Sequence, residues 1–156
     1  MDPAPNNLMC TLDSVEATRA LGATIAEAAR QGDTIALRGD LGAGKTSLAQ
    51  GFVRARLGDV EVTSPTFTLV QTYGAQDQEI WHVDLYRIED KAELEELGLE
   101  DAFGIALVLI EWPERMEADL PDNRLDILLE HDNAGGRLAV LTLRGNWAER
   151  RLDLKL

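Results

Sequence analysis

The chain has 156 residues, of which 28 are acidic and 15 basic, and its formal net charge is −13 at pH 7. This length can bury a sizeable core, so we expect residues 1–156 to form a single domain. The acidic balance disfavours direct binding to DNA, tRNA or an anionic membrane surface, because affinity for phosphates comes mainly from lysine and arginine. No run of about 18 apolar residues occurs, so we expect no membrane span.

Cysteine usage and the first residues bear on the compartment. Cys10 is the only cysteine, so an internal disulfide cannot form and nothing implies an oxidising environment. Residues 1–7 do not show a basic segment followed by an apolar one, which is the pattern of a secretory signal. We therefore expect a cytoplasmic protein in which Cys10 is structural rather than catalytic.

The first predicted elements are a helix, a strand and a second helix. Asp13 and Glu16 have the spacing of a capping box and begin a helix that is expected to end at Gly32. Its inner face consists of Thr18, Leu21, Ile25 and Ala28. A short apolar strand follows over residues 34–38. Helical spacing resumes at Lys45 and stops at Gly58, with an inner face made of Leu48, Phe52 and Ala55.

A hairpin and a short helix are predicted next. Residues 66–73 indicate a loop and then a strand, which a turn at 74–78 pairs with a strand over residues 79–86. Asp90, with Glu93 three residues later, is expected to cap a short acidic helix that extends to Leu97 and is solvated on its acidic face.

The remaining strands define the fold class. Residues 106–110 are continuously apolar, which is typical of a strand buried on both faces of a parallel sheet. Residues 124–130 and 137–143 alternate and predict an antiparallel closing pair joined by a turn at 132–136. The tail from Trp147 predicts no definite element. We predict an α/β fold, a P-loop NTPase-like three-layer sandwich with a mixed, mainly parallel sheet.

The strongest functional motif lies between the first predicted strand and the second helix. The run Gly39-Asp40-Leu41-Gly42-Ala43-Gly44-Lys45-Thr46 matches the P-loop pattern G-x-x-x-x-G-K-[ST] in full. Its glycines let backbone N–H groups surround phosphate oxygens, and the helix N-terminus adds its dipole. Lys45 is expected to reach the β- and γ-phosphates, and the Thr46 hydroxyl to ligate Mg²⁺. The predicted nucleotide-binding residues here are Asp40, Leu41, Gly42, Ala43, Gly44, Lys45, Thr46 and Ser47.

A P-loop site needs a carboxylate near the metal, and two acids are candidates. Glu111 follows the apolar run 106–110, and parallel strands deliver their last residue to the ligand crevice. Asp84 ends a shorter strand. The alternative for each is a solvated surface carboxylate. The neighbouring Trp112 is expected to pack in the core or at its rim rather than to stack on a base.

A candidate switch lies between the P-loop helix and the next strand. It consists of Ser64, Pro65, Thr66, Phe67 and Thr68, and it stands in the position where such a loop contacts the γ-phosphate. The alternative is an ordinary proline turn. The two histidines, His82 and His131, have no partners at metal-ligand spacing, so neither is predicted to be catalytic.

Four segments, in this order, resemble the TsaE family, the ATPases of bacterial tRNA threonylcarbamoyladenosine (t6A) biosynthesis. They are the P-loop run, residues 64–70, residues 82–87 and residues 110–113, and the resemblance spans about residues 11 to 143. It implies a Mg²⁺-dependent hydrolysis of ATP that is slow without partners and is coupled to the TsaB–TsaD pair. That pair transfers the threonylcarbamoyl group to tRNA, so this chain would act on tRNA only indirectly.

The resemblance implies roles for particular residues. Thr46 and Glu111 would hold Mg²⁺, and Asp84 would be a second acid near the metal or the attacking water. With Lys45, these two acids form the predicted catalytic set.

Two looser matches concern the rest of the nucleotide. Arg137 matches a family arginine near the nucleotide, and the segment around Thr11 matches one that lies against the adenosine end. Ser47 keeps the hydroxyl of the threonine that is more common at its position.

Two other functions fit the same motif. One is a small-molecule or nucleoside kinase, although the arginines that could form its lid (Arg115, Arg124 and Arg137) are scattered through the sequence. The other is a nucleotide-dependent binding switch with negligible hydrolysis. The absence of an Asn-Lys-x-Asp guanine-reading motif favours ATP over GTP.

Overall fold

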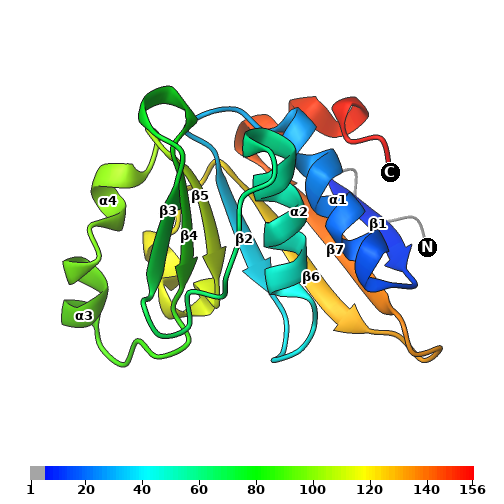
Figure 1. Cartoon of the computed structure of the whole chain (residues 1–156), viewed down its shortest axis with the longest axis horizontal. Coiled ribbons are helices and arrows are strands. Elements are labelled where there is room, and N and C mark those ends of the chain that lie inside the picture. Colours follow the sequence, from blue (N-terminus) through cyan, green and yellow to red (C-terminus); the bar gives the residue numbers. More distant parts are fainter. Residues whose placement is uncertain (1–5) are drawn as a thin grey trace.

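The computed structural model describes residues 6–156, except for the side chain of Glu117. Seven strands form one sheet in the order β1-β7-β6-β2-β5-β4-β3 (Figure 1). The strands are β1 (Asn7–Leu12), β2 (Thr34–Arg38), β3 (Val70–Tyr73), β4 (Ile80–Asp84), β5 (Leu107–Glu111), β6 (Arg124–His131) and β7 (Arg137–Arg144). The helices are α1 (Val15–Ala28), α2 (Lys45–Leu57), α3 (Lys91–Glu96) and α4 (Leu99–Ala102), with 3₁₀ turns at Gln76–Gln78, Pro113–Arg115, Glu117–Asp119 and Gly145–Asp153. Within the described residues, no helix is long and apolar enough to cross a membrane.

The centre of the sheet is parallel and both flanks are antiparallel. β2 pairs in parallel with β5 and β6, and β4 pairs in parallel with β5. The pairs β3–β4, β6–β7 and β1–β7 are antiparallel. Parallel and antiparallel pairings are equal in number, so the prediction of a mainly parallel sheet is wrong. Tight turns force two of the antiparallel pairs, and the third comes from β1, a strand that the sequence analysis did not predict.

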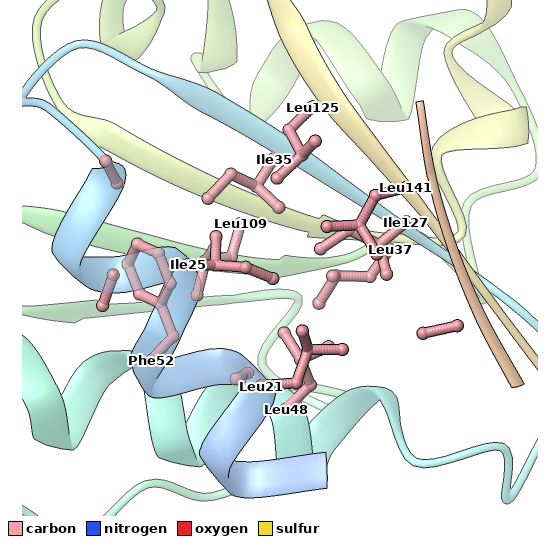
Figure 2. Close-up of a cluster of buried hydrophobic side chains, with 14 of the residues drawn as sticks. Leu21, Ile25, Ile35, Leu37, Leu48, Phe52, Leu109, Leu125, Ile127 and Leu141 are labelled. Atoms are coloured by element: carbon pink, nitrogen blue, oxygen red, sulfur yellow. The ribbon is translucent and has the colours of Figure 1, made fainter. Parts of the chain in front are cut away.

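Helices α1 and α2 lie over one face of the sheet, and the larger hydrophobic core lies beneath them (Figures 1 and 2). In β5, Leu109 belongs to this core, whereas Val108 and Ile110 belong to a second core that also contains residues of α3 and α4. Burial on both faces explains the continuous apolar run of β5. Among the described residues, the strands that contribute to the second core are β3, β4 and β5, so the predicted third layer covers that half of the sheet.

Two glycines set the spacing between α1 and α2. A Cβ atom at Gly22 would lie 2.1 Å from the carbonyl oxygen of Leu48, and one at Gly51 would lie 2.0 Å from that of Arg19. Side chains cannot occupy such distances, so the two helix backbones touch at these positions. This contact fixes α1 against α2, the helix that begins at the P-loop.

The first helix differs from its prediction at both ends. Its N-cap is Ser14, whose Oγ accepts a hydrogen bond of 3.0 Å from the N–H of Ala17, so Asp13 is not the cap. The helix ends at Ala28 rather than at Gly32. In α2, Ala55 is exposed, and the buried apolar residues are Leu48, Ala49, Phe52 and Val53.

The predictions for β2, the β3–β4 and β6–β7 hairpins and the buried β5 are confirmed. The Asp90 cap of α3 is also confirmed, because its carboxylate accepts a hydrogen bond from the N–H of Glu93. The tail packs on the core: Trp147 is fully buried, and Arg150 forms a buried ion pair with Asp33. Cys10 packs against the larger core from β1, and burial raises the pKa of its thiol.

Candidate functional site

The P-loop connects the C-terminal end of β2 to the N-terminus of α2. Gly44 is the N-cap of α2 with a φ of 110°, a left-handed conformation that favours glycine, and no side chain caps the helix. The first N–H groups of a helix have no partners within it. This end of α2 therefore presents unpaired donors and the positive end of a helix dipole, a combination that binds anions.

One cavity of about 270 Å³ brings most of the predicted site together. The P-loop contributes one wall, the 64–68 loop a second, and the ends of β4 and β5 a third. The lining residues are Leu41, Gly42, Gly44, Lys45, Thr46, Ser47, Ser64, Thr66, Asp84, Glu111 and Trp112.

The two candidate acids are neighbours at the ends of two parallel strands. Asp84 of β4 is in register with Glu111 of β5, and their exposed fractions are 4% and 3%. Asp84 is held by two donors: the N–H of Tyr86 at 2.9 Å from Oδ1, and the hydroxyl of Thr66 at 3.0 Å from Oδ2. Neither acid is a solvated surface carboxylate, so that alternative is wrong for both.

Glu111 is hydrogen-bonded to a histidine that sequence reasoning set aside. Nε2 of His82 lies 2.7 Å from Oε2 of Glu111, and both side chains are buried. His82 stands two residues before Asp84, so the alternation of β4 places both side chains on the same face of the sheet. The spacing in the sequence indicates this shared face, whereas the contact with Glu111 depends on the register of β4 against β5.

Lys45 lies beside Trp112 and contacts the base of its own loop. Its Nζ donates a hydrogen bond of 2.6 Å to the carbonyl oxygen of Gly39 and lies 3.7 Å from the centre of a Trp112 ring. Burial lowers the pKa of the Lys45 ammonium, and the charges of Glu111 and Asp84 oppose that shift. Trp112, expected only as packing, therefore contacts the P-loop lysine within the cavity.

The 64–68 loop reaches the cavity through two of its hydroxyls. Ser64 Oγ and Thr66 Oγ1 lie 2.7 Å apart, and Thr66 continues this chain of hydrogen bonds to Asp84. Pro65 is buried. Phe67 and Thr68 do not line the cavity: Phe67 is exposed beside Arg87, and the Thr68 hydroxyl accepts a hydrogen bond from Gln71.

A second cavity, of about 290 Å³, adjoins the other side of the P-loop and shares Gly42, Gly44 and Ser47 with the first. Its remaining lining residues come from the start of α1, the P-loop and the β6–β7 turn: Leu12, Asp13, Ser14, Val15, Thr18, Ala43, Gly135, Gly136 and Arg137. Arg137 donates to the carbonyl oxygens of Ala43 and Gly42. Thr11 and Asp40 line neither cavity.

The model of the family described as "Threonylcarbamoyl adenosine biosynthesis protein TsaE" matches residues 12–139. The chain belongs to the TsaE family. The tRNA threonylcarbamoyladenosine biosynthesis protein TsaE of Rickettsia conorii is 40% identical over 134 residues, which cover 85% of this chain and 77% of that protein. TsaE of Bacillus subtilis is 40% identical over 133 residues, covering 84% and 82%. The crystal structure of Bacillus subtilis YdiB is similar, with a TM-score of 0.78 and 31% identity over 92% of this chain and 89% of that one.

Membership of the TsaE family confirms the resemblance that the four segments indicated. Sequence reasoning missed His82, and for the second cavity it named only Arg137 and the segment around Thr11, whereas the lining residues are 12–15, Gly135 and Gly136. The cavity residues carry no motif of their own, because residues 12–15 lie beside Gly135 and Gly136 only after β1 and β7 have paired.

Proposed function

We propose that this TsaE-family chain is a single P-loop ATPase domain of t6A biosynthesis, which binds ATP with Mg²⁺ and hydrolyses its β–γ phosphoanhydride bond. The observation that carries this proposal is the cavity in which the open N-terminus of α2, Lys45, Thr46 and two buried acids converge. Few ligands other than a nucleotide triphosphate with its metal need so many hydrogen-bond donors for an anion beside a pair of carboxylates.

The two cavities suit the two ends of ATP. The first supplies Lys45 and the helix N-terminus for the phosphates, and the shared P-loop glycines lie between the cavities. The second lies on the other side of these glycines and has apolar residues such as Leu12 and Val15 beside Asp13 and Arg137 in its lining, so we assign it to the adenosine end. Arg137 would act there by holding the P-loop carbonyls rather than as a direct ligand.

The donors in the first cavity fit Mg²⁺. Within the described residues no three or more His, Cys, Asp or Glu side chains form a metal cluster, whereas Mg²⁺ in phosphate sites typically takes one or two carboxylates plus phosphate oxygens. Thr46, Glu111 and Asp84 offer hard oxygen donors in one cavity. We propose that these three hold the ion, which would neutralise charge on the transferred phosphoryl group.

The chain's own residues would prepare hydrolysis. Asp84 accepts hydrogen bonds from the Tyr86 N–H and from Thr66, and it would orient the attacking water or complete the metal shell. Lys45 would leave the Gly39 carbonyl for the β- and γ-phosphates. Among the described residues that line the first cavity, Lys45 is the only cation. We therefore expect slow hydrolysis until a partner adds a further contact to the phosphates.

Exposed apolar side chains beside the cavity support a protein partner. Leu41, Phe67 and Tyr86 have exposed fractions of 66%, 79% and 40%. Leu41 lines the cavity, Phe67 follows Thr66, and Tyr86 packs on Trp112. Apolar groups gathered at one place commonly mark an interaction site. We propose that a TsaB–TsaD-type complex docks there, so that the partner contacts the loops that hold the nucleotide.

The kinase alternative is less well supported. The three arginines that could form its lid are each hydrogen-bonded to the protein itself: Arg115 donates to the Tyr86 carbonyl, Arg124 to Asp126, and Arg137 to the P-loop. The test is ATP turnover by the full chain with and without TsaB–TsaD. We expect turnover to rise in the complex, and we expect little tRNA binding by the lone chain at physiological salt because of its net charge of −13. Tight, salt-sensitive tRNA binding, or no binding to TsaB–TsaD in any nucleotide state, would contradict the proposal. Complex formation without turnover would leave a nucleotide-dependent binding switch.

A further inference from the structure

His82 is a buried polar side chain beside the cavity to which the proposed function gives no role. Its exposed fraction is 0%, and it lies on β4 between Ile80 and Asp84 on the same face. Its Nε2 contacts Oε2 of Glu111, one of the two cavity acids, at 2.7 Å. A buried polar group is costly unless it is hydrogen-bonded, and an apolar residue would serve the core better if packing alone mattered.

The surroundings of the His82 ring indicate which nitrogen carries the proton. Nδ1 has no hydrogen-bond partner among the described residues, so a proton there would be an unpaired donor in a buried site. A proton on Nε2 is instead donated to the Glu111 carboxylate, which is an acceptor when ionised. Because leaving a buried donor unpaired is expensive, the ring has its proton on Nε2 and acts as a donor to Glu111.

We propose that His82 is a positioning residue for Glu111. Its hydrogen bond occupies Oε2 and restricts rotation of the carboxylate, which leaves Oε1 as the oxygen available to a cation. This inference rests on the proposed function, in which Glu111 is a ligand of Mg²⁺. Hydrogen-bond partners of metal ligands orient those ligands, and their removal typically lowers metal affinity or activity about 10–100-fold.

The test compares variants of His82 that differ in the donor they retain. His82→Leu removes the donor and keeps an apolar side chain of similar volume. His82→Gln can place its amide N–H₂ near the former Nε2, whereas His82→Asn places it near Nδ1 and does not reach Glu111. Ile80→Ala is the matched control, because it damages the packing of the same strand face without touching an acid. Affinity for ADP and for a non-hydrolysable ATP analogue is measured with Mg²⁺ and with EDTA, together with the Tm of each variant.

We expect His82→Leu and His82→Asn to weaken Mg²⁺-dependent binding of the ATP analogue about 10–100-fold, with binding in EDTA changed by less than about twofold. His82→Gln should recover most of the loss. Ile80→Ala should lower Tm and leave the Mg²⁺ dependence intact. In combination with Glu111→Gln, His82→Leu should add no further loss, because its effect acts through that carboxylate.

The outcomes separate this inference from the proposed function. If Glu111→Gln weakens Mg²⁺-dependent binding while the Leu and Asn variants of His82 do not, His82 has no positioning role although Glu111 remains a ligand. Equal losses with Mg²⁺ and with EDTA would show a structural role only. If Glu111→Gln itself has no effect, the assignment of Glu111 fails and the inference about His82 fails with it. Should His82→Leu not fold, the contrast between Gln and Asn decides the question.

Discussion

The hydroxyl of Thr66 donates a hydrogen bond of 3.0 Å to Oδ2 of Asp84 and thereby joins the 64–68 loop to the acid at the end of β4. Ser64 lies 2.7 Å from the same hydroxyl. An ordinary proline turn would need no such link to a buried carboxylate. The contact gives the proposed switch a route by which a change at the γ-phosphate reaches Asp84, or the reverse.

Thr66→Val keeps the shape of the side chain and removes the hydroxyl. We expect hydrogen exchange over residues 64–68 in the wild type to be slower with a non-hydrolysable ATP analogue than with ADP, because the γ-phosphate orders switch segments. In Thr66→Val this difference should shrink. The control is Thr68→Val, since Thr68 does not line the cavity. Equal protection with the two nucleotides in the wild type would leave the loop as a proline turn.

Asp84→Asn should separate hydrolysis from binding. The amide keeps the size of the side chain but removes the charge that we assign to the attacking water or the metal shell. We expect turnover in the TsaB–TsaD complex to fall about 10²–10⁴-fold, the range typical of general acid–base groups, while the ATP analogue still binds. Turnover within about twofold of the wild type would exclude both roles for Asp84.

Lys45→Ala should weaken ATP binding about 10–150-fold, which corresponds to the roughly 1.5–3 kcal/mol of a hydrogen bond to a charged group. The same lysine lies 3.7 Å from a Trp112 ring centre. Its movement to the phosphates should change the tryptophan fluorescence, and Trp112→Phe should abolish most of that change. Wild-type affinity and turnover in Lys45→Ala would refute the assignment of the phosphate site.

The sequence predicted the elements that local patterns determine. The P-loop follows from eight consecutive residues, and β5 follows from its unbroken apolar run. The pairing of β1 with β7 could not be predicted in this way, because Met9 interrupts the alternation of β1 and its partner strand is distant in sequence. The same applies to His82: its role depends on the register of β4 against β5, a relationship that no spacing within one strand reveals.

Gly51→Ala should destabilise the protein although alanine favours helices. A Cβ atom would lie 2.0 Å from the carbonyl oxygen of Arg19 on α1, so α1 must move or the helices must separate. We expect a loss of about 1–3 kcal/mol in the free energy of unfolding, as is typical of overpacking, against a gain of about 1 kcal/mol from propensity alone. Urea denaturation measures the difference. An increase in stability would show that the two backbones are not in contact.

Asp126 should make stability depend on pH through the three arginines that surround it. Arg144, Arg124 and Arg38 all contact its carboxylate, and its side chain is 7% exposed. Burial alone would raise the pKa of Asp126, but the hydrogen bond from Arg144 and the charges of Arg38 and Arg124 outweigh burial and hold the pKa below its ordinary value of 3.8. The unfolded chain therefore binds a proton at a higher pH than the folded chain does. The stabilisation is fully present above about pH 4 and is lost as the pH falls through the lower, folded-state pKa.

Asp126→Asn tests this dependence, because it removes the charge that Arg38, Arg124 and Arg144 share. We expect a loss of about 1.5–3 kcal/mol at pH 7, the value of hydrogen bonds to a charged group; the half-exposed Arg144 can regain water, which keeps the loss from being larger. The difference from the wild type should begin to narrow below pH 3.8, where the unfolded wild-type chain takes up the proton, and it should close once the pH falls below the lower, folded-state pKa. Asp122→Asn is the control, since Asp122 is an exposed acid before β6 and should change stability little at either pH. Urea unfolding of both variants and the wild type, at about five pH values between about 2.5 and 7, measures the free energy of unfolding at each pH. A difference that stays constant across this range would show that the substitution acts through packing and not through the Asp126 charge.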